Sequence, residues 1–478
     1  MLANIGFPVF LNISLIVLYC LTIIGLVILI LLENRNPLKT IPWVIVLIFI
    51  PGIGLIVYYF FGRDNRRLRS ITRRMYKKFK KQIRIDYQPQ DVSIVPENFL
   101  PLAKLLNNSN YSAISEGSLI SFFTNGKDKF EALLADIANA RHHIHLQYYI
   151  IEDDNIGKRV KEALVKKARE GIEIRVLYDD VGSWNVKNRF FDEMKEAGIE
   201  VWPILKVVFP VFTSKVNYRN HRKVVIIDGA IGYMGGMNIA DRYVDGNVLG
   251  HWRDTHFRIT GPGVYGLQAS FNLDWYATGN PLIKGANYYP PLPALSDTKM
   301  QIVMNGPTSQ WQTLMKAFIF CISNAKKYIY IQSPYFLPTE ALNLALQMAA
   351  LGEIDVRLMV PKHSDTKSAQ LATFSYMDKM LKAGVKVYLY KTGFLHSKLL
   401  LIDDMVSCFG SSNFDFRSFE HNFEINAFIY QNDFALKMKS MFIQDMRECE
   451  LLSYAVWRKR PIAERIAESF WRLFAPLL

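Results

Sequence analysis

The hydrophobic pattern of the chain begins with two long apolar runs. Residues 1–32 and 40–62 contain no Asp, Glu, Lys or Arg, and a short polar loop separates them. Each run reaches the roughly 20 residues that a helix needs to cross a bilayer. Pro51 and Gly52 interrupt the second run, which a membrane helix tolerates with a kink. We therefore predict two transmembrane helices, the first at about 9–32 and the second over the later run.

From about residue 110 the pattern changes to apolar strands that alternate with amphipathic helices. Residues 142–150 and 172–180 have the composition of strands, and residues 157–171 between them have apolar positions at the period of a helix. Such alternation is typical of α/β proteins, in which helices cover a sheet. We predict an α/β fold for this part of the chain.

The α/β pattern occurs twice. ALLADIANARHHIHLQYYI resembles AFIFCISNAKKYIYIQSPYF, which aligns Gln147 with Gln332, and MKEAGIEV recurs as MLKAGVKV. A repeat of this length indicates two fused halves and not a solenoid. We place the first half at 110–285 and the second at 286–478, with the boundary in a Pro-rich stretch.

Positive charge is concentrated directly after the apolar runs. The net charge is +14, and residues 63–81, the basic collar, hold ten Lys or Arg against one Asp. The positive-inside rule keeps such a collar in the cytoplasm, and the collar attracts anionic lipid. We assign residues 1–62 to the membrane and 63–109 to a basic juxtamembrane linker. Because the basicity is local, nucleic acid is not an expected partner.

Each half contains the same set of polar and small residues. In both copies a Lys, an Asp, a Gly and an Asn follow a His at intervals of 2, 7, 14 and 17 residues. The two sets are His221, Lys223, Asp228, Gly235 and Asn238 in the first half, and His396, Lys398, Asp403, Gly410 and Asn413 in the second. The shared intervals indicate shared chemistry.

The residue types and their parity suggest phosphate chemistry. On a strand, residues i and i+2 face the same side, so each imidazole projects beside an ammonium group. Two such pairs around one pocket suit a phosphate diester, because one imidazole can attack phosphorus while the other protonates the leaving alkoxide. The lysines offset charge on the oxygens, and the two Asn amides suit an anion. Each Asp has the opposite parity, so we expect it to anchor its strand.

No cofactor and no metal are expected. The three histidines at 142, 143 and 145 fall within one predicted strand, and we assign them to the core or to a strand face. Four cysteines without a CxxC pair also disfavour a zinc site and a disulfide framework.

These motifs resemble those of the phospholipase D superfamily, whose HxKxxxxD pattern both copies match. The apolar N-terminal runs, HLQYYI and WRDTHFRITGP resemble the bacterial cardiolipin synthases, over essentially the whole chain. The resemblance implies two pseudo-symmetric phospholipase D-like α/β/α sandwich halves after a two-helix transmembrane hairpin. It also implies that two phosphatidylglycerol molecules are joined into cardiolipin with release of glycerol, without metal or nucleotide.

The resemblance further assigns individual roles. His221 is the expected nucleophile, which forms a phosphohistidine, and His396 is the expected acid and then base. In the superfamily a carboxylate further downstream holds the histidine of the opposite half. The matching positions are Asp254 and Glu424, although their intervals from the motif histidines differ.

Several alternatives stay open at this stage. Water or a small alcohol as acceptor would make the protein a phospholipase D or a phosphatidylserine-type synthase, and a membrane-bound nuclease is a further possibility. The expected partners are phosphatidylglycerol and anionic lipid of the bacterial cytoplasmic membrane, with the catalytic part facing the cytoplasm. The sequence does not determine the oligomeric state. Residues 457–478, where aromatic residues alternate with Arg, suit either an interfacial helix or simple docking onto the domain.

Overall fold

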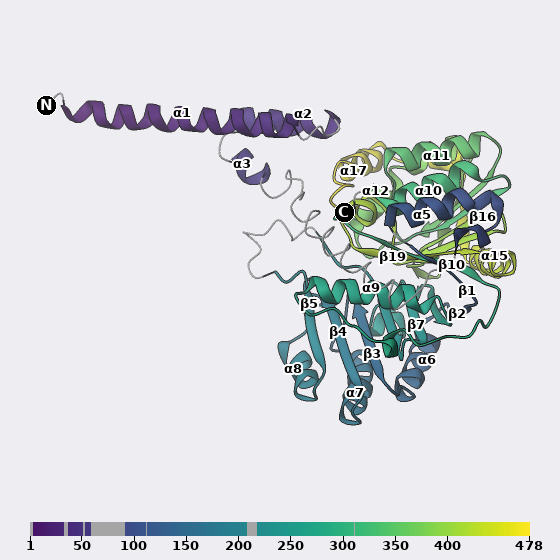
Figure 1. Ribbon diagram of the computed structural model, residues 1–478. Coiled ribbons are helices and arrows are strands. Elements are labelled where there is room, and N and C mark those ends of the chain that lie inside the picture. The colour runs from purple at the N-terminus through teal and green to yellow at the C-terminus, as the bar shows by residue number, and fades with distance from the viewer. Residues whose placement is uncertain are drawn as a thin grey trace. The chain divides into compact units, whose positions relative to one another are not determined.

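The structure is a computed structural model, and it describes residues 3–32, 37–50, 53–58, 91–110, 112–207, 218–309 and 311–478. The chain divides into an N-terminal unit, which holds the helices before residue 67, and a main unit. Figure 1 draws the first unit in purple and the second in blue through yellow. The basic collar lies outside the described residues.

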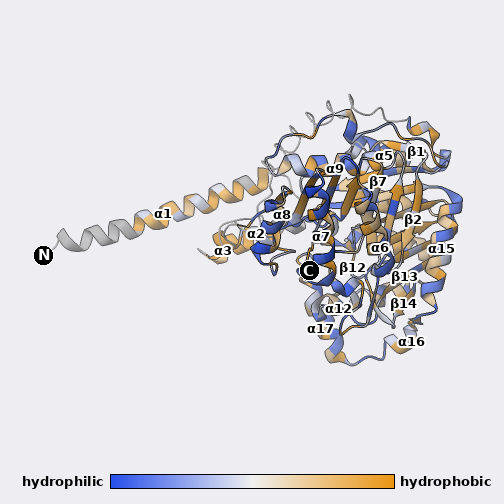
Figure 2. Ribbon diagram, turned by 90° about the horizontal axis from the view of Figure 1, so that it is seen from below, coloured by the Kyte–Doolittle hydropathy of each residue, from blue (hydrophilic) through white to orange (hydrophobic). Residues whose placement is uncertain are grey.

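The N-terminal unit consists of apolar helices. They are α1 (Ala3–Leu32), α2 (Pro37–Phe49) and α3 (Ile53–Val57). Ile23, Ile30, Leu47 and Tyr58 form a small buried cluster between them. Most other described side chains of α1 are exposed, and Figure 2 colours the ribbon of these helices by hydropathy. In the described part of the chain, Ile13–Leu32 is the one helix long and apolar enough to cross a membrane.

The second apolar run is described only in part. Its described residues form α2, which has 13 residues, and the short α3, and residues 51–52 between these helices lie outside the described part of the chain. Ile50 lies outside the assigned helices, but its amide donates to the Val46 carbonyl at 3.0 Å and its carbonyl accepts from the Gly54 amide at 2.8 Å. The structure thus contains one candidate span, and the two-helix hairpin stays a prediction.

The main unit contains two large sheets that repeat one strand order. Among the described residues, seven strands form the first sheet, in the order β2-β9-β7-β6-β3-β4-β5. They are β2 (Leu119–Phe123), β3 (His143–Tyr148), β4 (Glu173–Asp179), β5 (Glu200–Ile204), β6 (Val224–Ile227), β7 (Ile231–Gly235) and β9 (His256–Thr260). Strands β3, β4 and β5 run parallel, and β6 and β7 are antiparallel neighbours.

The second sheet contains the corresponding order, β10-β19-β17-β16-β11-β13-β14, with β1 and β20 added at its edges. Its strands are β1 (Ile114–Glu116), β10 (Lys299–Asn305), β11 (Tyr328–Gln332), β13 (Asp355–Pro361), β14 (Lys386–Tyr390), β16 (Leu399–Ile402), β17 (Val406–Gly410), β19 (Glu424–Tyr430) and β20 (Cys449–Leu451). The matching order confirms the predicted duplication.

Helices cover the outer faces of both sheets and fill the space between them (Figure 1). The outer face of the first sheet packs on α6 (Gly126–Ala138), α7 (Asn155–Arg169) and α8 (Asn188–Glu196). Between the sheets lie α9 (Val264–Ala277) and α15 (Asn432–Met446). The outer face of the second sheet packs on α5 (Leu100–Asn110), α10 (Thr313–Asn324), α11 (Glu340–Leu351), α12 (Lys367–Phe374) and α13 (Met377–Lys382).

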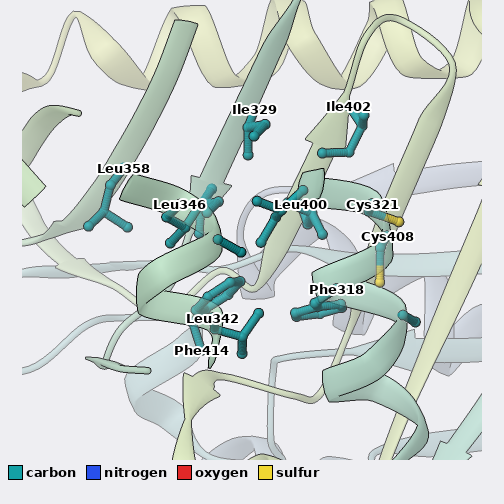
Figure 3. Close-up of a cluster of buried hydrophobic side chains, with 14 of the residues drawn as sticks. Phe318, Cys321, Ile329, Leu342, Leu346, Leu358, Leu400, Ile402, Cys408 and Phe414 are labelled. Atoms are coloured by element: carbon teal, nitrogen blue, oxygen red, sulfur yellow. The ribbon is translucent and has the colours of Figure 1, made fainter. Parts of the chain in front are cut away.

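The core of the second half includes residues that the sequence analysis placed in the linker. Phe99, Leu102 and Leu106 are buried in the cluster that Figure 3 shows in part, around Phe318 and Leu346. They stand at helical intervals, so α5 presents one apolar face to the sheet. In the structure residues 91–110 therefore belong to the second half, and the highly charged stretch before them obscured this short helix in the sequence.

Short elements complete the main unit. Strand β8 (His251–Arg253) pairs in parallel with β15 (Gly393–Leu395), and β12 (Phe336–Leu337) pairs with β18 (Phe414–Asp415). The remaining helices are α14 (Phe416–Glu420), α16 (Tyr454–Trp457) and α17 (Ile462–Arg472). Because β8 belongs to the first half and β15 to the second, their pairing joins the two halves close to the second motif.

Candidate active site

The backbone of each motif histidine is held by the opposite half. The His221 amide donates a hydrogen bond to the Phe423 carbonyl at 2.9 Å, immediately before β19. The His396 amide donates to the Arg253 carbonyl at 2.7 Å, at the end of β8. The two histidine segments thus dock onto the opposite half next to Glu424 and Asp254. Both histidine side chains are largely buried.

Two crossed pairs of imidazole and carboxylate result. Nδ1 of His221 lies 3.1 Å from each carboxylate oxygen of Glu424, and Nδ1 of His396 lies 2.6 Å from Oδ2 of Asp254. A carboxylate accepts a hydrogen bond from Nδ1–H, and in this tautomer the lone pair is on Nε2. Each ring therefore has one nitrogen fixed by the other half, and Nε2 is the atom that can react.

The two lysines lie in a shared electrostatic environment. Nζ of Lys223 donates to the His221 carbonyl at 2.6 Å, and Nζ of Lys398 donates to the His396 carbonyl. Burial lowers the pKa of Lys223 to about 7, and repulsion from Lys398 adds to this effect while Glu424 opposes it. Burial likewise lowers the pKa of Lys398 to about 8, against the attraction of Asp254 and Glu424. A bound anion would therefore stabilise the charged form of both lysines.

Burial also governs the histidines. It lowers the pKa of His221, although Glu424 opposes the shift, and it lowers the pKa of His396 to about 4, with a further contribution from Lys398. For Glu424 the balance is different: burial alone would raise its pKa, but His221, Lys223 and Ser411 together lower it. The site therefore combines neutral imidazoles with an ionised Glu424 near neutral pH.

The two motif aspartates lie away from the histidines. Asp228 accepts hydrogen bonds from the backbone amides of 141, 142 and 143, and Asp403 accepts them from the amides of 326, 327 and 328. Each carboxylate thus binds the start of the neighbouring central strand. His221 and Asp228 stand at opposite ends of β6, roughly 20 Å apart at the rise of a strand. Asp228 and Asp403 therefore anchor the sheets and do not contact the reacting atoms.

The two motif asparagines are engaged within their own halves. Oδ1 of Asn238 accepts from the Ile150 amide, and its Nδ2 donates to the Tyr243 hydroxyl at 2.7 Å. Nδ2 of Asn413 donates to Asp415 at 2.9 Å, and its Oδ1 is buried without a hydrogen-bond partner among the described residues. These contacts shape the loops after the motifs, and phosphate binding by the amides stays a prediction.

Aromatic rings pack against both imidazoles. The ring of Tyr149 lies 5.0 Å from that of His221. Trp252, Tyr243 and Phe394 lie 5.5 to 5.8 Å from the ring of His396. No pattern in the sequence marks these side chains as part of the site, because their positions follow no shared interval in the two halves. They surround the reactive rings with low-dielectric material, which explains the large effect of burial on the pKa values.

A second layer of ion pairs, also absent from the sequence analysis, supports the histidine segments. Arg253 forms a bidentate ion pair with Asp445 of α15, at 2.9 and 2.8 Å, and Arg222 donates to Asp274 of α9 at 2.7 Å. The aligned glutamines join the same carboxylates, since Gln147 donates to Asp274 and Gln332 donates to Asp445. The repeated Gln was the one signal in the sequence that pointed to these networks.

Small residues lie next to the two carboxylates that contact the histidines. A Cβ atom at Gly236 would lie 2.1 Å from Oδ1 of Asp254, so a side chain does not fit there. At the equivalent position of the second half, Ser411 donates through Oγ to Glu424. Among the described residues, no group of three or more His, Cys, Asp or Glu is placed to hold a metal ion.

Two sheets of one topology, each supplying a His and a Lys to a common cluster, define the class of phospholipase D-like phosphotransfer proteins. A family model described as cardiolipin synthase, PLD-like domain, matches residues 133–251 and 318–446, and a phospholipase D-nuclease N-terminal model matches residues 20–63. The crystal structure of phosphatidylserine synthase from Haemophilus influenzae Rd KW20 has the same fold, with a TM-score of 0.62 at 15% identity, over 78% of this chain and 99% of that one.

Curated relatives cover nearly the whole chain. A cardiolipin synthase of Geobacillus kaustophilus strain HTA426 is 39% identical over 97% of this chain and 93% of its own length. The major cardiolipin synthase of Bacillus subtilis strain 168 is 39% identical over 98% of this chain and 99% of its own length. The chain therefore belongs to the bacterial cardiolipin synthase family of the phospholipase D superfamily, and it is an enzyme of the phosphatidyltransferase class.

Proposed function

We propose that the protein joins two phosphatidylglycerol molecules into cardiolipin and releases glycerol, through a phosphohistidine intermediate. The observation that carries this proposal is the crossed pairing of His221 with Glu424 and of His396 with Asp254. Each ring is oriented by the half that supplies the other ring, so both reactive Nε2 atoms serve one phosphorus atom. Family membership supports the choice of substrates.

The first half of the reaction transfers the phosphatidyl group to the protein. The lone pair on Nε2 of His221 attacks phosphorus, and the bond from phosphorus to the glycerol oxygen breaks. His396 is neutral in the free site, and the negative charge of the bound diester favours its protonated form. The protonated ring then gives its proton to that oxygen, so glycerol leaves as a neutral alcohol. Glu424 stabilises the positive charge that develops on the His221 ring, as a carboxylate does beside a reacting imidazole.

The second half of the reaction returns the group to a lipid. His396, now neutral, accepts the proton of a hydroxyl of the second phosphatidylglycerol. That oxygen attacks phosphorus, the bond to His221 breaks, and cardiolipin forms. Lys223 and Lys398 offset the charge on the non-bridging oxygens in both steps. Burial lowers the pKa of both lysines because it removes the water that stabilises their ammonium groups. A bound anionic phosphate stabilises these ammonium groups in place of that water.

A membrane position follows from the substrates. Both lipids must reach the site from a bilayer, and the apolar helix Ile13–Leu32 is long enough to hold the protein there. We propose that the run 40–62 completes a second span and that the basic collar keeps the catalytic unit on the cytoplasmic side, according to the positive-inside rule.

The test is to incubate the purified protein with phosphatidylglycerol vesicles and to analyse the lipids and the released alcohol. Equal amounts of glycerol and cardiolipin support the proposal. Phosphatidic acid as the main product would indicate that water is the acceptor. Mass spectrometry of the acid-labile phospho-protein locates the intermediate, and phosphate on His396 in place of His221 would reverse the two roles. His363→Ala, at an exposed position, is the matched control for replacement of either motif histidine.

A further inference from the structure

The last helix of the main unit, α17, has two different faces. Glu468 and Ala475 are buried, and Trp471 packs against the core of the second half. Arg460 pairs with Glu468 and further fixes this face. The helix also packs along α12, and the Arg472 guanidinium lies 4.4 Å from the centre of the Tyr376 ring. One face of α17 is therefore docked onto the domain.

The opposite face carries large apolar side chains. Ile462 is 73% exposed, Ile466 64% and Phe470 53%. In the turns that follow α17, Leu473 and Leu477 continue the stripe with 76% and 53% exposure. These residues recur every three or four positions, which is the period of one helix face. We name them the α17 stripe, and Figure 2 shows where α17 lies in the hydropathy-coloured ribbon. A contiguous apolar surface of this kind marks an interaction site.

The charges around the α17 stripe identify its partner. The exposed charged side chains between 457 and 478 are Arg458, Lys459, Arg465 and Glu464, three basic against one acidic. Apolar residues on one face with basic residues beside them are typical of helices that lie in the interface of an anionic bilayer. A protein partner would need an apolar groove surrounded by acidic groups. An anionic bilayer has both features, because its acyl chains are apolar and its headgroups are negatively charged.

The α17 stripe also lies close to the candidate active site. The Leu477 carbonyl accepts a hydrogen bond from Arg417 at 3.0 Å. Arg417 follows the motif residue Asn413 by four positions in the chain. Burial and Asp179 raise the pKa of Tyr149, and the Arg417 charge opposes this rise. The Tyr149 ring lies 5.0 Å from that of His221. A bilayer that contacts α17 would thus bring headgroups next to the reactive residues.

A second connection leads through α12. Tyr335 donates to Asp365 at 2.7 Å, just before α12 begins. Asp365 also raises the pKa of Lys398 by its charge. Asp365 stands two residues before α12, the helix along which α17 packs.

We propose that the α17 stripe inserts into the interface of an anionic bilayer as a membrane contact of the catalytic unit, separate from the N-terminal helices. It sets the distance and angle at which the site meets lipid headgroups. This inference goes beyond the proposed function, since it concerns how the main unit is seated on the membrane and not which reaction it performs.

The test uses the full-length protein reconstituted in phosphatidylcholine vesicles with or without phosphatidylglycerol. A polarity-sensitive fluorophore is attached to Ile466→Cys or Phe470→Cys, with Cys20→Ser and Cys449→Ser as background. The control variant is Leu436→Cys on α15, and the Leu436 side chain is 44% exposed. Helix α15 packs on the face of the second sheet that is opposite to α12 and α17. We expect blue-shifted emission at 466 and 470 and quenching by spin-labelled lipid, strongest with phosphatidylglycerol, and neither effect at 436.

Two results would overturn the inference. Probes at 466 and 470 that stay in water, in a preparation that still makes cardiolipin, would show that the stripe does not contact lipid while the proposed function stands. Energy transfer between labelled copies without quenching by lipid would show that a second copy covers the stripe. A double variant, Ile466→Asp with Phe470→Asp, supplies a functional readout: we expect a several-fold higher KM for vesicular substrate with an unchanged unfolding midpoint, because both side chains are exposed.

Discussion

Nδ1 of His221 lies 3.1 Å from both carboxylate oxygens of Glu424, although 203 residues separate the two in the chain. His396 has the converse partner, Asp254, at 2.6 Å. Neither half therefore contains a complete imidazole–carboxylate pair of its own. The cooperation of the halves is built into the orientation of the reactive rings, and this arrangement makes several results predictable.

Removal of either carboxylate charge should impair catalysis more than folding. In Glu424→Gln the amide can still contact Nδ1, but it cannot stabilise an imidazolium. We expect kcat to fall about 10²–10⁴-fold, the usual range for loss of acid–base assistance. Radiolabelled phosphatidylglycerol measures the rate, and Asp378→Asn, in an exposed surface pair with Lys382, is the control. Equal rates for Glu424→Gln and the unmodified protein would contradict the proposed roles.

The activity should depend on pH through the buried lysines. The pKa of Lys223 is lowered to about 7 and that of Lys398 to about 8. As the pH rises through this window the free site loses positive charge, so its attraction for an anionic diester weakens. We expect kcat/KM, which reports the free enzyme, to decline progressively above about pH 7, the lower of the two pKa values, and inhibition by inorganic phosphate to weaken in parallel. A kcat/KM that stays level up to pH 9 would show that the lysines remain charged.

Gly236 should be essential because of its small size. A Cβ atom there would lie 2.1 Å from Oδ1 of Asp254, so Gly236→Ala must push the carboxylate away from His396. We expect a loss of activity close to that of Asp254→Asn, about 10²-fold or more, in a protein that still folds. Gly352→Ala is the matched control, because the nearest atom to its Cβ is 3.2 Å away at a helix end. Assays of both variants in the same vesicles decide the point.

The ion pair between Arg253 and Asp445 should contribute to stability as well as to activity. Both side chains are buried, and loss of one partner leaves an uncompensated charge, which costs about 3–5 kcal/mol. We expect Asp445→Ala to lower the free energy of unfolding by this amount, measured by urea denaturation in detergent. Activity should fall too, since the Arg253 carbonyl holds the His396 amide.

An exposed ion pair provides the comparison for that measurement. Glu131 and Arg159 form a pair in which the side chains are 58% and 49% exposed. Glu131→Ala should change the free energy of unfolding by no more than about 1 kcal/mol. If both variants lost the same small amount, the buried pair would have no special structural importance.

Local pattern in the sequence determined several features directly. The alternation of strands and helices, the duplication and the equal intervals of the two motifs depend on residues close together in the chain, where the periods of 2.0 and 3.6 leave a visible record. Asp228 and His221 have opposite parity in the sequence, and the extended strand β6 between them keeps them apart in the structure. The apolar length of Ile13–Leu32 also needs no tertiary context.

Other features were decided by tertiary contacts. The assignment of α5 and β1 to the second sheet, the aromatic rings around His396 and the bidentate pair of Arg253 with Asp445 join residues far apart in the chain. Such contacts impose complementarity of shape and charge but no periodicity, so one sequence does not reveal them. The sequence also left open whether α17 docks onto the domain or faces outward. The structure shows that one face docks while the other leaves an apolar stripe exposed.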